Sequence, residues 1–260
     1  MFKFKALVLS VLLFIITSST VLAAPTNSNQ YVPILMYHNV IGPDDTVTNW
    51  SGQVSVSMFR SQLQTLTDNG FTSITFMDYN NYLDGKCSLP EKPFIVTFDD
   101  GYLDNYTIAY PIMEEMGVKS TMFVSTKYVG TTTTAGPHFT WDNAMDMENS
   151  GLVDIQSHTN THANMSLVGI TNFKEEIETS FNLIEENLGA RDIKVLAYPQ
   201  FKNCWESRKT AVDFGVSLQI TTLANEKNST TTLKNELHRI HVHDHMSGED
   251  LLKEINKLTK

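Results

Sequence analysis

The sequence predicts an α/β fold in which parallel strands alternate with helical crossovers, as an open sheet or a barrel. Short apolar runs with β-branched members recur along the chain and suit strands that are buried on both faces. Segments with apolar residues at helical spacing separate these runs. The chain has 260 residues, without an internal repeat or a long linker, so we expect one domain around one sizeable core.

The first half of the chain is expected to supply four strands, at 31–36, 71–76, 94–98 and 119–124. A helix is predicted after Ser57, a good N-cap residue, and Asn69-Gly70 ends it. A short helix is expected at 78–83, and a longer helical stretch at 102–116 with a break at Pro111. The polar segment 41–53 carries turn signals and is expected to be a loop.

The second half is expected to supply four more strands, at 152–156, 194–198, 216–222 and 239–242. Helices are predicted at 141–147, 172–188, 206–214 and 247–258, where apolar residues share one face. The segments 129–136 and 224–232 are expected to be surface loops. In the longest helix we interpret Glu175, Glu176 and Glu178 as a solvated face.

The N-terminus reads as a targeting segment. Lys3 and Lys5 precede an apolar stretch at 6–16, which is too short to span a bilayer comfortably, and small residues around Ala23 suit a cleavage site. We expect a signal peptide at 1–23, a short tail at 24–30, and the folded domain at 31–260. The protein would then be secreted, outside the cell or at the cell wall, with no stable membrane span after cleavage. An uncleaved anchor is the alternative.

Composition narrows the choice of partners. The formal net charge of −10 argues against nucleic acid, because phosphate binding needs a basic face. A hydrophobic fraction of 41% and a charged fraction of 18% indicate a globular chain, and we expect a monomer. Cys87 and Cys204 could form a disulfide in an oxidising compartment or stay as free thiols, because pairing depends on their separation in space.

Polar side chains follow several of the expected strands, where ligands gather in parallel α/β folds. These groups are His38, Asp99-Asp100, His158 with His162, and Tyr198-Pro199. Two histidines spaced by four residues can converge on one ion if the segment turns helically. Asp100 would complete a set of two histidines and one carboxylate, which leaves positions open for water and substrate. Each group alone also fits ordinary polar surface, whereas the combination indicates a divalent metal centre, with zinc as the first choice.

On these residues the sequence resembles the polysaccharide deacetylases of the NodB-homology type, carbohydrate esterase family 4. The resemblance is carried mainly by Thr-Phe-Asp-Asp-Gly at 97–101 and Ser-His-Thr-Asn-Thr-His at 157–162. Further matching motifs lie at 33–38, 197–199 and 239–242, in the order of the poly-N-acetylglucosamine deacetylase branch. The resemblance covers nearly the whole mature chain. It implies a distorted (β/α) barrel of about seven parallel strands.

The resemblance also implies roles for individual residues. Asp99 would be the general base, and Asp100, His158 and His162 would hold zinc, or else cobalt, nickel or manganese. Tyr198 and Pro199 belong to the segment whose next backbone N–H, at Gln200, would bind the oxyanion. The implied activity is a secreted hydrolase that uses metal-activated water to remove N-acetyl groups from N-acetylglucosamine-containing polysaccharide of a cell wall or an exopolysaccharide.

The sequence departs from the family pattern beside this segment. The pattern reads Ala-Tyr-Pro-Tyr-Gly, whereas this chain has Gln200 and Phe201 in the last two places. A backbone N–H survives a change of side chain, but glycine permits backbone geometry that phenylalanine resists. Many relatives place an arginine two residues before the proline to hold the catalytic aspartate. That position is Ala197 here, and Arg239 from a neighbouring strand is the candidate substitute.

The proton donor is a second departure. The late Leu-X-X-His motif of the family is not clean in this chain, where His238, His241, His243 and His245 crowd the C-terminal region. We interpret these four mainly as surface residues. His38, at the mouth of the first strand, is the preferred donor to the departing amine.

Two alternative functions stay open at this point. The departures at Gln200 and Phe201 would also suit a catalytically impaired relative that binds glycan. The same residues could act as an O-acetyl esterase on an acetylated polysaccharide. A two-carboxylate glycosidase is disfavoured, because adjacent aspartates cannot readily straddle a glycosidic bond at the ~5 to ~9 Å separation that such enzymes use.

Overall fold

A computed structural model describes residues 30–49, 52–222, 228 and 232–259. The expected signal peptide lies outside the described residues, as does most of the expected 224–232 loop. The main sheet follows one path, in which all neighbouring strands are parallel. In path order its strands are β12 (Leu237–His238), β11 (Leu218–Thr222), β10 (Val195–Ala197), β9 (Val153–Ser157), β6 (Ser120–Val124), β5 (Pro93–Asp100), β1 (Ile34–Tyr37) and β13 (Ile240–His241).

The sheet curls until its two ends nearly meet. β12 pairs with β11 at one end of the path and β13 pairs with β1 at the other, yet Arg239 alone separates β12 from β13 in the sequence. The expected strand at 239–242 is shortened to β13, β12 precedes it outside the expected range, and the chain changes neighbours at Arg239. The expected single α/β domain, a distorted barrel of parallel strands, is confirmed, with eight strands on the path and β4 (Thr72–Ser73) beside β5.

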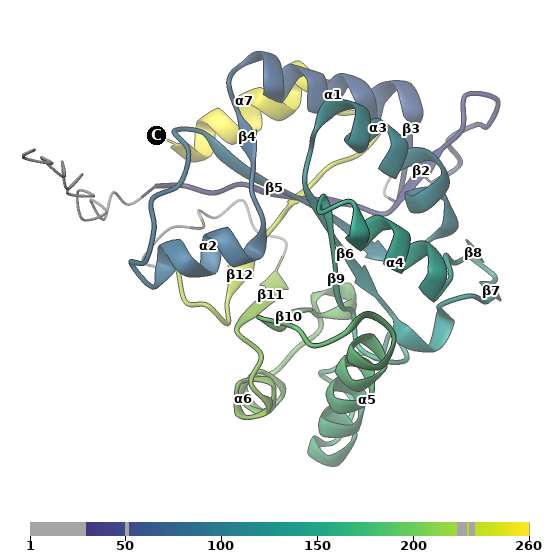
Figure 1. The fold of residues 1–260 in the computed structure, drawn as a ribbon, viewed down its shortest axis with the longest axis vertical. Coiled ribbons are helices and arrows are strands. Elements are labelled where there is room, and N and C mark those ends of the chain that lie inside the picture. Colours follow the sequence, from purple (N-terminus) through teal and green to yellow (C-terminus); the bar gives the residue numbers. More distant parts are fainter. Residues whose placement is uncertain (1–29, 50–51, 223–227, 229–231, 260) are drawn as a thin grey trace, which may run out of the picture.

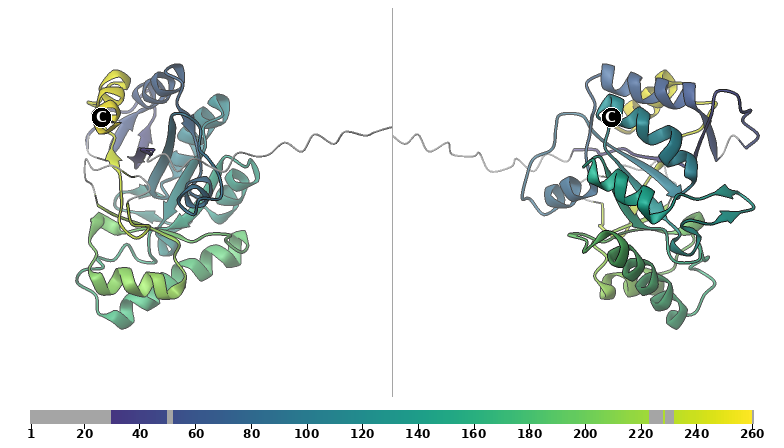
Figure 2. Two further views of the ribbon diagram at one scale, coloured as in Figure 1. Left: turned by 90° about the vertical axis from the view of Figure 1, so that its left-hand side faces the viewer. Right: turned by 45° about the vertical axis from the view of Figure 1, so that its right-hand side comes forward.

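Helices surround the barrel (Figures 1 and 2). They are α1 (Val56–Asp68), α2 (Phe76–Leu83), α3 (Tyr110–Met116), α4 (Trp141–Asn149), α5 (Ile170–Leu188), α6 (Trp205–Phe214) and α7 (Gly248–Thr259). The first and last of these, α1 and α7, lie side by side in both figures. Among the described residues, no helix has both the length and the apolar character needed to cross a membrane.

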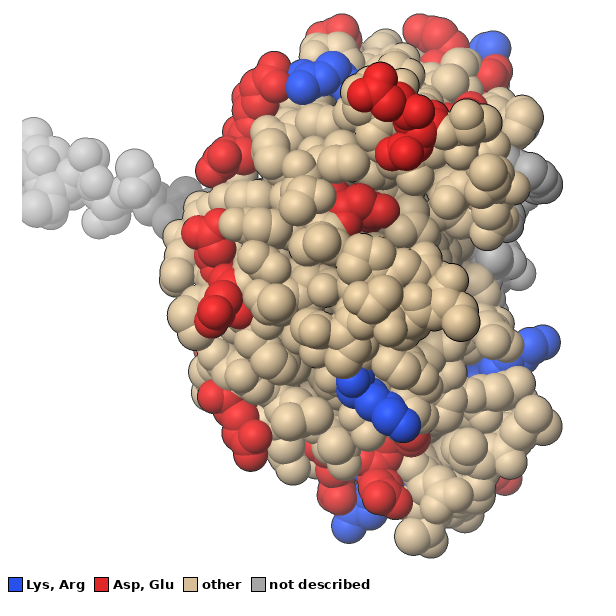
Figure 3. Space-filling model, turned by 90° about the vertical axis from the view of Figure 1, so that its right-hand side faces the viewer, with Lys and Arg blue, Asp and Glu red and all other residues tan. Residues whose placement is uncertain are grey.

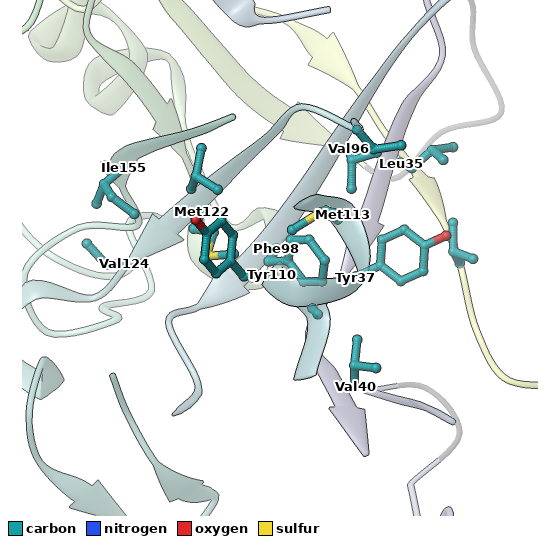
Figure 4. Packing of buried hydrophobic residues seen from close by; sticks show 14 of the residues in the cluster. Leu35, Tyr37, Val40, Val96, Phe98, Tyr110, Met113, Met122, Val124 and Ile155 are labelled. Atoms are coloured by element: carbon teal, nitrogen blue, oxygen red, sulfur yellow. The ribbon is translucent and has the colours of Figure 1, made fainter. Parts of the chain in front are cut away.

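Alternation along the strands divides the apolar residues between two cores. On β5, Val96 and Phe98 join the core between the sheet and its helices, which Figure 4 shows at close range. Ile95 joins the other core, which gathers residues from strands at both ends of the path and so fills the barrel. Thr97 and Asp99 share the face of Ile95. The strand pattern thus directs Asp99 into the barrel.

Several helix starts differ from expectation. α1 begins at Val56 with Ser55 at its N-cap position, so Ser57, the expected N-cap, lies inside the first turn. The expected strand at 71–76 is only Thr72–Ser73, because Thr75 caps a helix that begins at Phe76 rather than at residue 78. The Thr75 hydroxyl accepts from Asp78 N (3.1 Å), and the Asp78 carboxylate accepts from Thr75 N (2.9 Å). The break expected at Pro111 lies upstream of it, where a π-helical turn, η1 (Asn105–Ala109), leads into α3.

Two expected loops contain short strands, and both lie near the carboxyl ends of the barrel strands. Segment 41–53 joins the parallel pair β2 (Asn39–Ile41) and β3 (Gln53–Ser55). Segment 129–136 contributes to an antiparallel hairpin of β7 (Thr132–Thr133) and β8 (Gly136–Pro137). Single 3-10 turns, η2 (Thr126–Tyr128) and η3 (Pro199–Phe201), follow β6 and β10. Cys87 and Cys204 are both free thiols.

Candidate metal centre and active site

Two adjacent aspartates end β5 and face different environments. Asp99 is 2% exposed and points into the barrel. Asp100 has φ of 74°, a left-handed backbone that an aspartate adopts only at some cost. Gly101 follows at φ 74°, and a Cβ there would lie 3.0 Å from the Val124 side chain, so any other residue would be strained in this turn. The turn separates the two carboxylates.

Asp100 meets two imidazoles that arrive on a different loop. Its Oδ1 lies 3.6 Å from His158 Nε2 and 3.3 Å from His162 Nε2. One ligand atom from each of the three residues lies within 4.8 Å of the others. The structure therefore brings together the predicted set of two histidines and one carboxylate.

The loop that carries the histidines is not helical. Thr159 and His162 have φ of 66° and 58°, so the chain makes a tight irregular turn. Glu176 on α5 holds this turn, because its carboxylate accepts from Asn160 N (3.0 Å), Thr161 N (2.8 Å) and the Thr161 hydroxyl (2.6 Å). The expectation of a solvated face is wrong for Glu176, and the sequence carried no signal for its role.

The three side chains fit a divalent cation. Asp100 Oδ1 is buried and has no hydrogen-bond partner, which is costly unless a cation takes that position. The backbone oxygen of Ala197 lies 2.7 Å from His158 Nδ1 and accepts its proton, so the Nε2 lone pair is directed at Asp100. Burial lowers the pKa of His158, which favours the neutral ring that metal binding needs. Asp100, His158 and His162 would hold the cation.

Arg239 holds Asp99. Its guanidinium donates to both carboxylate oxygens, at 2.7 and 2.5 Å, and also to the Thr97 hydroxyl at 3.0 Å. Burial works to raise the pKa of Asp99, but the charges of Arg239 and His158 and the Arg239 hydrogen bonds hold it well below the usual value. Asp99 is therefore ionised and able to accept a proton. The contact expected between Arg239 and Asp99 is present.

His38 lies on the other side of Asp99. Its Nε2 is 3.9 Å from Asp99 Oδ2, and its side chain is a quarter exposed. The backbone oxygen of His38 accepts from Asn105 Nδ2 at 2.6 Å, and the same amide donates to Asp104. The structure thus brings His38 to the site with a fixed backbone and an open approach from solvent.

The segment after β10 carries Tyr198, Pro199 and Gln200, which the family resemblance assigned to the oxyanion region. Tyr198 is buried, and its hydroxyl donates to Gln219 Oε1 at 2.8 Å. Pro199 is buried and Gln200 is exposed. Gln200 and Phe201 both have left-handed backbones, with φ of 54° and 56°. The ring of Phe201 lies 5.3 Å from Cζ of Arg239, so this residue contacts the group that holds Asp99.

Three of the four late histidines lie together at β13 and just after it. The rings of His241 and His243 have centroids 5.9 Å apart, and those of His243 and His245 are 6.4 Å apart. His241 and His243 are half-buried and His245 is exposed. The interpretation of these residues as mainly surface residues fits this exposure.

The fold and the site together define a class of protein: an α/β barrel with a candidate metal centre at the carboxyl ends of its strands. Residues 86–218 match the family model described as polysaccharide deacetylase. The chain therefore belongs to the polysaccharide deacetylase family. This confirms the family that the sequence motifs indicated.

Similarity to individual proteins agrees with the family. The chain is 29% identical over 218 residues to YxkH of Bacillus subtilis, whose name assigns it to the polysaccharide deacetylases, covering 84% of this chain and 73% of that one. It is 29% identical over 150 residues to the poly-beta-1,6-N-acetyl-D-glucosamine N-deacetylase of Escherichia coli K12, covering 53% of this chain but only 22% of that longer one. The Streptococcus pyogenes deacetylase PplD, solved in complex with acetate, superposes with a TM-score of 0.78 at 26% identity, over 87% of this chain and 99% of that chain.

Proposed function

We propose that this chain is a secreted, metal-dependent hydrolase that removes N-acetyl groups from N-acetylglucosamine-containing polysaccharide of a cell wall or an exopolysaccharide. One observation carries the proposal: the ionised Asp99 lies beside the candidate metal ligands, with its Oδ2 3.9 Å from His158 Nε2. The name of the Escherichia coli relative supports the N-acetylglucosamine substrate, and the acetate bound to PplD is the product such a reaction would release.

The reaction hydrolyses the C–N bond of an acetamide, so it needs one group that accepts a proton from water and one that donates a proton to the amine. Asp99 accepts a proton from the attacking water, and Arg239 keeps the carboxylate in position for it. The backbone N–H of Gln200 would donate to the oxyanion that forms on the carbonyl. His38 would give a proton to the departing amine, which leaves as the second product beside acetate. A divalent cation bound by Asp100, His158 and His162 would polarise the carbonyl and lower the pKa of water.

Zinc is the cation we propose, because two imidazoles and one carboxylate with open positions suit it; cobalt, nickel or manganese would fit the same donors. We further propose that residues 1–23 are a signal peptide, that 24–30 form a tail, and that the folded domain at 31–260 acts as a monomer.

The test is acetate release from N-acetylglucosamine oligomers and polymers, with and without a chelator. We expect release that stops on chelation and returns with zinc. Asp99→Asn should lower kcat by at least about 100-fold, the scale of losing a general base, with metal content unchanged. Undiminished release by Asp99→Asn would contradict the proposal.

A second candidate is favoured by one observation, the pair of left-handed residues at Gln200 and Phe201 where the family pattern ends in glycine. A catalytically impaired relative would bind glycan at full metal occupancy without releasing acetate. Ester and amide substrates compared side by side would in turn identify an O-acetyl esterase.

A further inference from the structure

A cavity of about 450 Å³ starts at the candidate metal centre and runs beneath the β7–β8 hairpin. Asp100 and His162 line it, and so do Thr133, Thr134 and Ala135 of the hairpin. Its volume is within the range of small-molecule sites. Neither the expected base nor the expected proton donor is among its lining residues. The cavity therefore joins two of the candidate metal ligands to the hairpin.

His138 ties the hairpin to the metal centre. Its Nδ1 lies 3.0 Å from the backbone oxygen of Asp100, and its Nε2 lies 3.2 Å from the Thr133 hydroxyl. A carbonyl oxygen can only accept, so Nδ1 carries the proton, and in the neutral ring Nε2 accepts from Thr133. His138 is 7% exposed, so this link is shielded from water. The hairpin wall of the cavity is thus fixed relative to Asp100.

Aromatic rings form the second wall. Tyr102 stacks on His138 with ring centroids 5.1 Å apart, and Tyr128 stacks on it at 5.8 Å. The Tyr128 hydroxyl also donates to the backbone oxygen of Thr161, at 3.3 Å, on the loop that carries the histidine ligands. Both tyrosines line the cavity. The wall therefore connects the hairpin with both loops of the metal centre.

The chemistry of the lining suits an uncharged, hydroxylated ligand. Besides the rings, Ser125, Thr133, Thr134 and Thr161 contribute hydroxyls, and no lysine or arginine lines the cavity. Figure 3 shows the side of the molecule that carries the hairpin, where Asp and Glu outnumber Lys and Arg. Away from Asp100 and His162, the lining therefore offers no cationic side chain to pair with an anionic ligand. A pyranose unit, with apolar C–H faces and a rim of hydroxyls, matches both walls.

We propose that this cavity binds the sugar unit next to the one being deacetylated, so that the β7–β8 hairpin sets how strongly the protein prefers oligomers over single sugars. This inference rests on the proposed function. The small side chain of Ala135 at the exposed hairpin tip leaves room for that neighbouring unit. A bulky side chain at the tip would occupy the space while leaving Asp99, Asp100 and the histidines untouched.

The test compares Ala135→Trp with Thr132→Trp. Thr132 is exposed on the same hairpin and does not line the cavity, because neighbouring strand residues point to opposite faces. The first readout is the ratio of kcat/KM for penta-N-acetylglucosamine to that for N-acetylglucosamine. The second is the Kd of the pentasaccharide, measured by calorimetry in EDTA, which needs no metal and no turnover. Thr134→Trp at the tip replaces Ala135→Trp if the latter misfolds.

We expect Ala135→Trp to lower the ratio, and to weaken pentasaccharide binding, by at least about tenfold, and Thr132→Trp to change either by less than about twofold. If the wild type processes or binds the pentasaccharide and the tip variants leave the kcat/KM ratio and the Kd unchanged, the inference is overturned and the proposed function stays intact. A wild type that binds the pentasaccharide in a tip-dependent way but releases no acetate would support the subsite and contradict the proposed reaction. A wild type that does neither would overturn both.

Discussion

The ring of Phe201 lies over the guanidinium of Arg239, with 5.3 Å between the ring centroid and Cζ. A second ring, Phe123, lies 5.8 Å from the same Cζ. Arg239 is 2% exposed, so its flat surface is covered by aromatic carbon while its N–H groups bind Asp99. Phe201 occupies a left-handed backbone position, φ 56°, that glycine would fill without strain. The contact with Arg239 gives a physical reason for phenylalanine, rather than glycine, at this position.

Replacing the ring should therefore reduce turnover more than binding. Phe201→Leu keeps an apolar side chain with the same backbone constraint but removes the ring, and we expect kcat to fall by roughly 3- to 10-fold with KM nearly unchanged. Phe201→Tyr keeps the ring and should retain most of the activity. Steady-state kinetics on a soluble N-acetylglucosamine oligomer would measure both. Equal losses in the two variants would show that the ring over Arg239 is not what matters.

Removing the arginine should cost folding stability as well as activity. Arg239→Met leaves the buried Asp99 carboxylate without its partner, and we expect the free energy of unfolding to fall by about 3 to 5 kcal/mol. In an Asp99→Asn background the same replacement should cost much less, because no buried charge is left behind. Chemical denaturation of the four proteins of this cycle measures the difference. The same cost in both backgrounds would contradict the pairing as a source of stability.

Glu176 should control metal affinity through the loop it holds. Glu176→Gln removes a charged acceptor from Asn160 N and Thr161 N, and we expect the Kd for zinc to rise by about 10- to 100-fold. Glu175→Gln is the matched control, since Glu175 is the neighbouring, exposed glutamate on the same helix. Competition with a chromophoric chelator would measure both Kd values. If the two variants bind zinc equally well, the loop does not depend on Glu176.

Asp104, which lies near the site, should make the free energy of unfolding depend on pH. Burial raises its pKa to about 6, although hydrogen bonds from Asn39, Val40 and Asn105 work in the other direction. The folded chain keeps this proton up to about pH 6, whereas the unfolded chain loses it near the ordinary aspartate pKa of 3.8. Folding therefore takes up a proton between these values, and this contribution to stability declines as pH rises through the window.

Asp104→Asn does not titrate, so its stability relative to wild type should improve as the pH rises from 4 to 7. We expect an improvement of roughly 1 to 3 kcal/mol, read from denaturation curves at the two ends of the range. A difference between variant and wild type that stays constant with pH would show that Asp104 titrates alike in the folded and unfolded chains.

The sequence predicted the parts of the site that depend on strand order. Asp99, Asp100 and His158 end or directly follow strands, and parallel strands bring their carboxyl ends together. Arg239 was expected beside Asp99 for a different reason, as the substitute for the arginine that relatives carry where this chain has Ala197. The confirmed fold follows from the same alternation of apolar runs and helical segments.

Other parts could not be predicted, because they depend on distances across the fold. Glu176 reaches the histidine loop only because α5 packs beside β9, and nothing in a run of glutamates marks one as the acceptor. His138 stands alone in a polar segment, so neither its contact with Asp100 nor the hairpin around it gave a signal. Capping by Thr75 replaced most of an expected strand, because a local hydrogen-bonded cap outweighed the β propensity of that segment.

Asp100, His158 and His162 should share one divalent cation beside Asp99. Anomalous diffraction at the zinc edge, from crystals of the wild-type protein grown with zinc, tests this arrangement directly. We expect one strong peak at about 2.0 to 2.2 Å from a carboxylate oxygen of Asp100 and from Nε2 of both histidines. A peak elsewhere with this site empty of zinc, or a site in which one of the three side chains turns away from the ion, would contradict it.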